Sequence, residues 1–159
     1  MALEADPSFR QGTDLRGGQA GLRCARAQAL ISYRCFEGYR IRQSEPDPDT
    51  LFAERVASYQ RYQGEKFLRR FDAYSYYSLC NALDSHNVGR GRGGVAAALG
   101  RIRAAATVVA IDTDVIFPTL EARTWAPMIP GAEYIEISSS FGHDGFLLET
   151  ARLSAILMK

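Results

Sequence analysis

Two short apolar segments towards the C-terminus place the strongest constraint on the fold of this chain. Residues 107–111 read Thr-Val-Val-Ala-Ile and residues 134–137 read Tyr-Ile-Glu-Ile, and helical patterns follow them over 120–129 and 146–158. This alternation predicts an α/β fold with parallel strands joined by crossover helices. An unbroken apolar strand is typical of one that is covered on both faces. Because a stable sheet needs roughly three strands or more, we expect the rest of the sheet to come from elsewhere.

A carboxylate and an imidazole follow the two predicted strands. Asp114 lies just beyond the first strand and His143 just beyond the second. Neighbouring parallel strands end at the same edge of a sheet, so the two side chains are candidates for the acid and base of a nucleophile–His–acid triad. Asp112 is an alternative acid, and Asp114 could instead be a solvated loop residue or a helix cap. The other histidine, His86, is expected to lie at a helix end.

The part of the chain before the strands has a different pattern. From Asp14 to Asn87 we find no strand, and apolar side chains recur at helical spacing over 21–33, 51–62 and 73–83. Asp49 and Thr50 are placed to cap the second of these helices. The sequence therefore predicts a layer of helices without a sheet of its own, with the proline-rich residues 43–49 as a loop.

A short Gly/Arg-rich segment, residues 89–94, separates the two patterns, and a further helix is expected over 95–103. The segment is too short for an RNA-binding repeat and follows no strand, as a phosphate-binding loop would. We interpret it as a flexible hinge.

Composition excludes several classes of protein. The 159 residues suit about one domain, and a net charge of +1 gives no reason to expect nucleic acid or a membrane surface as a partner. No apolar run is long enough to span a bilayer, and the first ten residues lack the pattern of a signal peptide, so a cytoplasmic location is expected. Cys24, Cys35 and Cys80 have no metal or redox spacing and are expected to be reduced structural thiols, without a metal site.

Several segments together resemble one known family. They are Tyr-Gln-Arg-Tyr-Gln-Gly-Glu-Lys-Phe from 59, Arg-Arg-Phe-Asp-Ala from 69, Ala-Leu-Asp-Ser-His from 82, Gly-Arg-Gly from 89, Ala-Leu-Glu-Ala-Asp-Pro from 2, Gly-Leu-x-x-Ala-Arg from 21, Ile-Ser-Tyr-Arg from 31, Asp-x-x-Phe-Pro from 114 and Gly-His-Asp from 142. This set is similar to homoserine O-acetyltransferases of the α/β-hydrolase superfamily, over essentially the whole chain.

The resemblance implies a division of the chain and an activity. Residues 1–88 would hold the end of a core helix and a helical lid, 89–94 the linker, and 95–159 the C-terminal part of an α/β-hydrolase core. The implied reaction transfers acetyl from acetyl-CoA, a co-substrate, to the side-chain hydroxyl of L-homoserine in methionine biosynthesis. No cofactor is expected, and the lid helices would form a homodimer.

The resemblance also implies roles for four residues. Asp114 matches the triad acid and His143 the triad base. Asp144 matches the carboxylate that holds the ammonium group of the substrate, and Arg26 matches an arginine that binds the substrate carboxylate, where a planar guanidinium can form two hydrogen bonds. A surface arginine on the first helix is the alternative for Arg26.

The nucleophile of the family has no counterpart in this sequence. The family serine lies in a G-x-S-x-G elbow ahead of the segment that resembles Ala2 to Phe9, and no such motif occurs here. Ser138, Ser139 and Ser140 are poor substitutes because none lies on a strand-to-helix elbow. We therefore expect the C-terminal half of an enzyme whose partner is the missing N-terminal half. An inactive remnant, a helical dimerisation module, or a related acyltransferase or hydrolase with another acyl donor or acceptor are the alternatives.

Overall fold

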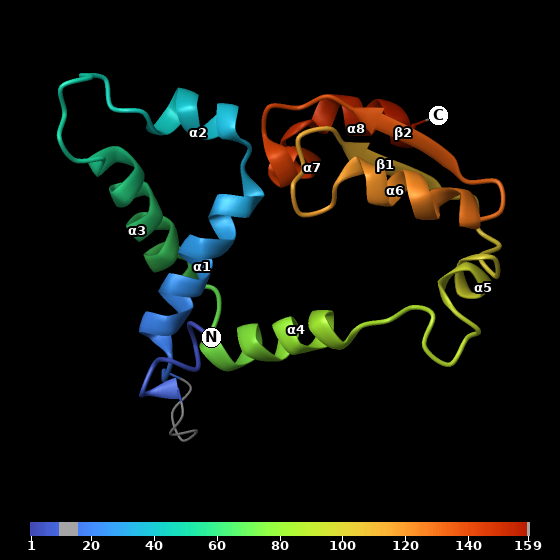
Figure 1. Cartoon of the computed structure of the whole chain (residues 1–159), viewed down its shortest axis with the longest axis horizontal. Coiled ribbons are helices and arrows are strands. Elements are labelled where there is room, and N and C mark those ends of the chain that lie inside the picture. The colour runs from blue at the N-terminus through green and yellow to red at the C-terminus, as the bar shows by residue number, and fades with distance from the viewer. Residues whose placement is uncertain (10–15, 159) are drawn as a thin grey trace. The chain divides into compact units, whose positions relative to one another are not determined.

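The computed structural model describes residues 1–9 and 16–158 in two compact units (Figure 1). Met1–Ile31 and Tyr39–His86 form the first unit, and Ser32–Gly38 and Asn87–Lys159 form the second. Asp14, where the predicted helical layer begins, lies outside the described residues. None of the described helices combines the length and the apolar character that crossing a membrane requires.

The first unit is built from helices. Its elements are α1 (Gln19–Tyr33, whose last two residues fall in the second unit), α2 (Phe36–Gln43, likewise shared), α3 (Glu54–Leu68) and α4 (Ala73–Ser85). Leu3, Leu22 and Ala73 are buried, and Phe9 and Phe67 pack against them with other aromatic side chains. The described residues of this unit contain no strand, in agreement with the helical layer predicted from the sequence.

The start of α3 differs from the prediction. The helix begins at Glu54, and its N-cap Ala53 makes no side-chain cap bond, so Asp49 and Thr50 do not cap it. Glu45, in the preceding loop, caps the start of α3, because its carboxylate accepts a hydrogen bond from the backbone N–H of Arg55 at 2.7 Å. A cap that comes from ten residues away leaves no local signal. The α2 helix was also not predicted.

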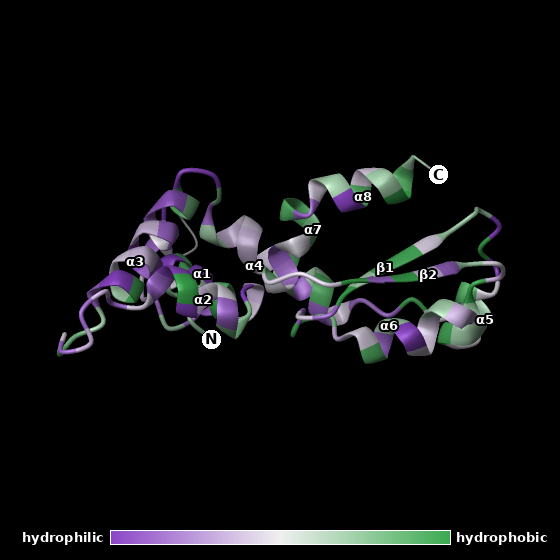
Figure 2. Ribbon diagram, turned by 90° about the horizontal axis from the view of Figure 1, so that it is seen from above, coloured by the Kyte–Doolittle hydropathy of each residue, from purple (hydrophilic) through white to green (hydrophobic). Residues whose placement is uncertain are grey.

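The second unit contains a parallel pair of strands with helices on both sides. Its elements are α5 (Val95–Leu99), β1 (Thr107–Ile111), α6 (Thr119–Trp125), η2 (Ala126–Met128), β2 (Glu133–Ile137), η3 (Gly142–Asp144), α7 (Gly145–Leu148) and α8 (Thr150–Leu157). Thr107 lies opposite Glu133, and the register continues to Ile111 opposite Ile137. Figure 2 shows α6 on one side of this pair and α7 and α8 on the other. The two strands and their crossover helix agree with the sequence prediction.

Two helices of this unit are shorter than predicted. The helix expected over 95–103 ends at Leu99, and the one expected over 146–158 is divided into α7 and α8 at Glu149. Residues 89–94 form compact turns, in which the N–H groups of Arg92 and Gly94 donate to the carbonyl of Gly89 at 3.0 and 3.2 Å. The flexibility proposed for this segment stays a prediction.

The two strands differ in how their outer edges are protected. β2 carries Glu136, which pairs with Arg123 at 2.6 Å and accepts a hydrogen bond from Tyr134 at 2.9 Å. β1 has only apolar residues after Thr107 and, among the described residues, pairs with β2 alone. Charged side chains discourage unwanted strand pairing, and β1 lacks them. The edge of β1 is therefore where a further strand would add.

We expect residues 1–159 alone to be poorly soluble or loosely packed, because a two-stranded sheet with an open apolar strand is below the size needed for stability. Binding of a hydrophobic dye would measure exposed apolar surface, and sedimentation would measure aggregation. Val109→Lys, which places a charge on β1, is expected to reduce sedimentation. A sharp unfolding transition of a monomer without dye binding would contradict the prediction.

Candidate active site

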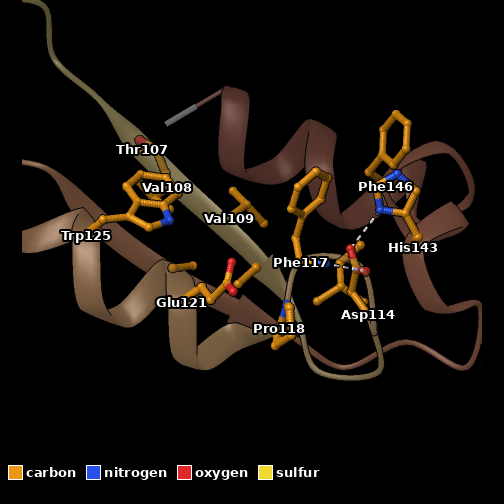
Figure 3. A pocket seen from close by; sticks show the side chains of 13 residues that line it. Thr107, Val108, Val109, Asp114, Phe117, Pro118, Glu121, Trp125, His143 and Phe146 are labelled. Atoms are coloured by element: carbon orange, nitrogen blue, oxygen red, sulfur yellow. Dashed lines mark hydrogen bonds and ion pairs between the residues drawn. The ribbon is translucent and has the colours of Figure 1, made fainter. Parts of the chain in front are cut away.

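Asp114 and His143 meet at the carboxyl ends of β1 and β2. Oδ2 of Asp114 lies 2.8 Å from Nδ1 of His143 (Figure 3). Oδ1 accepts hydrogen bonds from the N–H groups of Ile116 and Phe117 at 2.8 and 3.0 Å. The Asp114 side chain is 8% exposed and that of His143 is 19% exposed. Both carboxylate oxygens of Asp114 have partners, so its side chain is held in place. A neutral imidazole that donates from Nδ1 to Asp114 would have Nε2 as its proton acceptor.

Aromatic rings surround the imidazole of His143. The ring centroids of Tyr33, Phe117 and Phe146 lie 5.5, 5.4 and 5.3 Å from that of His143. These rings restrict the orientation of the imidazole. They come from the end of α1, the loop after β1 and α7, so sequence spacing gave no sign that they would meet.

Two side chains after β1 tie together the loops that carry the acid and the histidine. The Thr113 hydroxyl donates to the carbonyl of Ser139 at 2.6 Å and accepts from the N–H of Gly142 at 3.1 Å. Asp112 accepts from the N–H of Ser139 at 3.0 Å, and this bond, with the Ser138 hydroxyl, lowers the pKa of Asp112. Asp112, the alternative acid, therefore binds the loop backbone, whereas Asp114 is the carboxylate beside His143.

The segment Ser32–Gly38 packs against residues 138–144, the histidine loop, which carries His143. Gly142 has φ +64°, and a Cβ there would lie 2.7 Å from the backbone N of Cys35. The Cys35 thiol lies 2.8 Å from the carbonyl oxygen of Ser140, and Nε of Arg34 lies 3.0 Å from Oδ2 of Asp144. Sequence reasoning gave none of these contacts, although the match of residues 31–34 to the family was a signal.

A pocket of about 500 Å³ opens beside the Asp114–His143 pair (Figure 3). It extends along β1 and is lined mainly by apolar side chains. The lining residues are Thr107, Val108, Val109, Ala110, Ile111, Asp114, Phe117, Pro118, Glu121, Ala122, Trp125, His143 and Phe146. All five residues of β1 line it, so the strand forms one wall of the pocket.

The remaining predicted residues are placed as follows. Asp144 directly follows His143 and pairs with Arg34. Arg26 belongs to the first unit, where its guanidinium lies 5.0 Å from the centroid of the Phe67 ring. Ser139 is buried and its hydroxyl accepts from the N–H of Phe141 at 3.1 Å, so it is occupied within its own loop. No described group of three or more His, Cys, Asp or Glu side chains could hold a metal ion.

Comparison with known proteins identifies relatives of the chain. A homoserine O-acetyltransferase of Thermus thermophilus is 46% identical over 159 residues, covering 99% of this chain and 39% of the relative. One from Cyclobacterium marinum is 41% identical over 157 residues, covering 99% of this chain and 44% of the relative. The chain belongs to the homoserine O-acetyltransferases. It spans about two fifths of the length of these relatives and corresponds to their C-terminal half.

Solved structures agree on the fold. The crystal structure of a homoserine O-acetyltransferase from Bacillus anthracis matches with a TM-score of 0.80 at 17% identity, covering 94% of this chain and 43% of that one. The predicted α/β-hydrolase fold is thereby confirmed for the part present here. No family model matches the chain.

Proposed function

We propose that this chain supplies the acid and base of an O-acetyltransferase that acts on L-homoserine with acetyl-CoA, in methionine biosynthesis. The 2.8 Å contact between Asp114 and His143 is the observation that carries the proposal, because it leaves Nε2 of His143 free to act on a hydroxyl. The nucleophilic serine would come from an N-terminal half outside this chain, packed along the open side of β1. No cofactor is required, and a cytoplasmic location remains part of the proposal.

The reaction would proceed in two steps. In the first, Nε2 of His143 takes the proton of the serine hydroxyl as the serine oxygen attacks the thioester carbonyl, and then gives that proton to the departing sulfur of CoA. In the second, His143 takes the proton of the homoserine hydroxyl, which attacks the acetyl-serine, and returns it to the serine oxygen. Asp114 stabilises the imidazolium in both steps.

The acceptor would be held by its charged groups. A carboxylate such as Asp144 suits an ammonium group, and Arg26 suits the substrate carboxylate.

We also propose dimerisation through the helices of the first unit. Leu79 and Leu83 support it, because they lie one turn apart on α4 and are 53% and 75% exposed.

A completed enzyme tests the proposal. In it, residues 1–159 follow an N-terminal part taken from the Thermus thermophilus relative. We expect homoserine-dependent release of CoA from acetyl-CoA by the completed enzyme, and no turnover above background by residues 1–159 alone, where His143 has no serine to activate. Release of CoA without dependence on homoserine would favour the hydrolase alternative. Turnover by residues 1–159 alone would contradict the hypothesis that the nucleophilic serine lies outside these residues.

Asp144→Asn in the completed enzyme tests how the acceptor is bound. The change removes the charge that would pair with the homoserine ammonium, so we expect transfer to homoserine to fall by about 10- to 100-fold. The burst of CoA release that accompanies acetylation of the serine should remain. Single-turnover measurements separate the two steps. An equal loss in both would show that Asp144 supports His143 instead of the substrate.

A further inference from the structure

The carboxylate of Asp144 already has a partner within the second unit. Nε of Arg34, a buried atom without a well-aligned hydrogen bond, lies 3.0 Å from Oδ2 of Asp144. The two side chains are only 23% and 16% exposed. A partly buried ion pair is screened less by solvent and salt than a surface pair, so it can hold a defined geometry.

Arg34 itself is fixed by its place in the chain. It lies in Ser32–Gly38, whose backbone approaches Gly142 so closely that a Cβ there would lie 2.7 Å from the backbone N of Cys35. The Cys35 thiol adds its contact with the Ser140 carbonyl, and Gly38 approaches the same carbonyl so closely that a Cβ would lie 3.1 Å from it. Arg34 therefore reaches Asp144 from a backbone that already packs on the same loop.

We propose that Arg34 is a positioning residue for the acceptor, acting through Asp144. By holding Oδ2, it fixes the orientation of the carboxylate and leaves Oδ1 for the ammonium group of the amino-acid substrate. Its own positive charge adds nothing to cation binding, so its contribution is orientation. The inference rests on the proposed function and gives Arg34 a role in it.

The experiment compares three variants of the completed enzyme: Arg34→Gln, Asp144→Asn and the double variant. Arg34→Gln is expected to lower kcat/KM for homoserine by about 10- to 100-fold while the acetylation burst stays within about twofold. The double variant should be no worse than Asp144→Asn, because Arg34 acts only through that carboxylate. Arg34→Lys keeps the charge and should recover part of the loss.

An acceptor without the ammonium group separates positioning from a general structural role. 4-Hydroxybutanoate keeps the hydroxyl and carboxylate of homoserine, so Arg34→Gln should leave transfer to this compound unchanged. Arg123→Gln is the matched control, since it breaks the Arg123–Glu136 pair of the same unit, and it should alter neither step.

Three results would overturn the role of Arg34. The first is a loss of kcat/KM in the double variant equal to the product of the losses in Arg34→Gln and Asp144→Asn. The others are an equal loss of transfer to homoserine and to 4-hydroxybutanoate in Arg34→Gln, or loss of its acetylation burst. Thermal unfolding of each variant shows whether Arg34→Gln remains folded, and Arg34→Lys provides the comparison if it does not. Turnover of the unmodified completed enzyme with homoserine is measured first. Its absence would reject the proposed function, whereas an active enzyme that is indifferent to Arg34→Gln would reject the positioning role alone.

Discussion

His143→Ala and Asp114→Asn in the completed enzyme are each expected to lower turnover by about 10⁴-fold or more, as in other triads. The histidine is the group that takes the serine proton, so its removal stops acetylation. Asp114→Asn keeps the shape of the side chain but loses the charge that stabilises the imidazolium, and an amide can favour the wrong tautomer of His143 across their 2.8 Å contact. Steady-state turnover and the size of the CoA burst measure both effects.

Two variants serve as controls for this pair. His86→Ala changes the other histidine, an exposed residue at the end of α4, and should leave turnover unchanged. Asp112→Asn keeps an oxygen that can accept from the Ser139 N–H, so we expect a loss below about tenfold. A loss at Asp112 as large as that at Asp114 would contradict the assignment of Asp114 as the triad acid.

Gly142→Ala is expected to be the most damaging small substitution near the site. A non-glycine residue at φ +64° costs about 1–3 kcal/mol from backbone conformation alone. The added Cβ would also lie 2.7 Å from the backbone N of Cys35 and 2.9 Å from the backbone C of Arg34, so the histidine loop must move away. A shift of about 1 Å at a catalytic group can cost about 10²-fold in rate. Turnover and thermal unfolding of the completed enzyme measure the two losses.

Gly131→Ala is the matched control for that substitution. Gly131 has φ +71°, and a Cβ there would meet no atom within 4 Å. It therefore carries the conformational cost without the steric one. We expect Gly131→Ala to lower stability modestly and to leave turnover intact. If both alanine variants had the same turnover, the close packing of Ser32–Gly38 on the histidine loop would not matter for function.

Much of the second unit followed from the sequence because its signals are local. An all-apolar β-branched run predicts β1, and the alternation of strand and helix predicts the parallel pairing with β2. An acid and a histidine after successive parallel strands were expected to lie at one edge of the sheet, and the structure brings Asp114 and His143 together there. Their catalytic roles, and those of Asp144 and Arg26, stay predictions.

The contacts that surround the site depended on the tertiary structure. The Cys35 thiol and the Ser140 carbonyl are 105 residues apart in the chain, and the Glu45 cap of α3 likewise comes from outside the helix. Periodicity and capping rules read neighbours in sequence, so they cannot identify partners at such separations. The sequence alone was enough to predict the two strands, most of the helices and the placement of Asp114 and His143 at one edge of the sheet. Only the packing of Ser32–Gly38 against the histidine loop decided that Arg34 pairs with Asp144, because that ion pair exists only after distant segments have folded together.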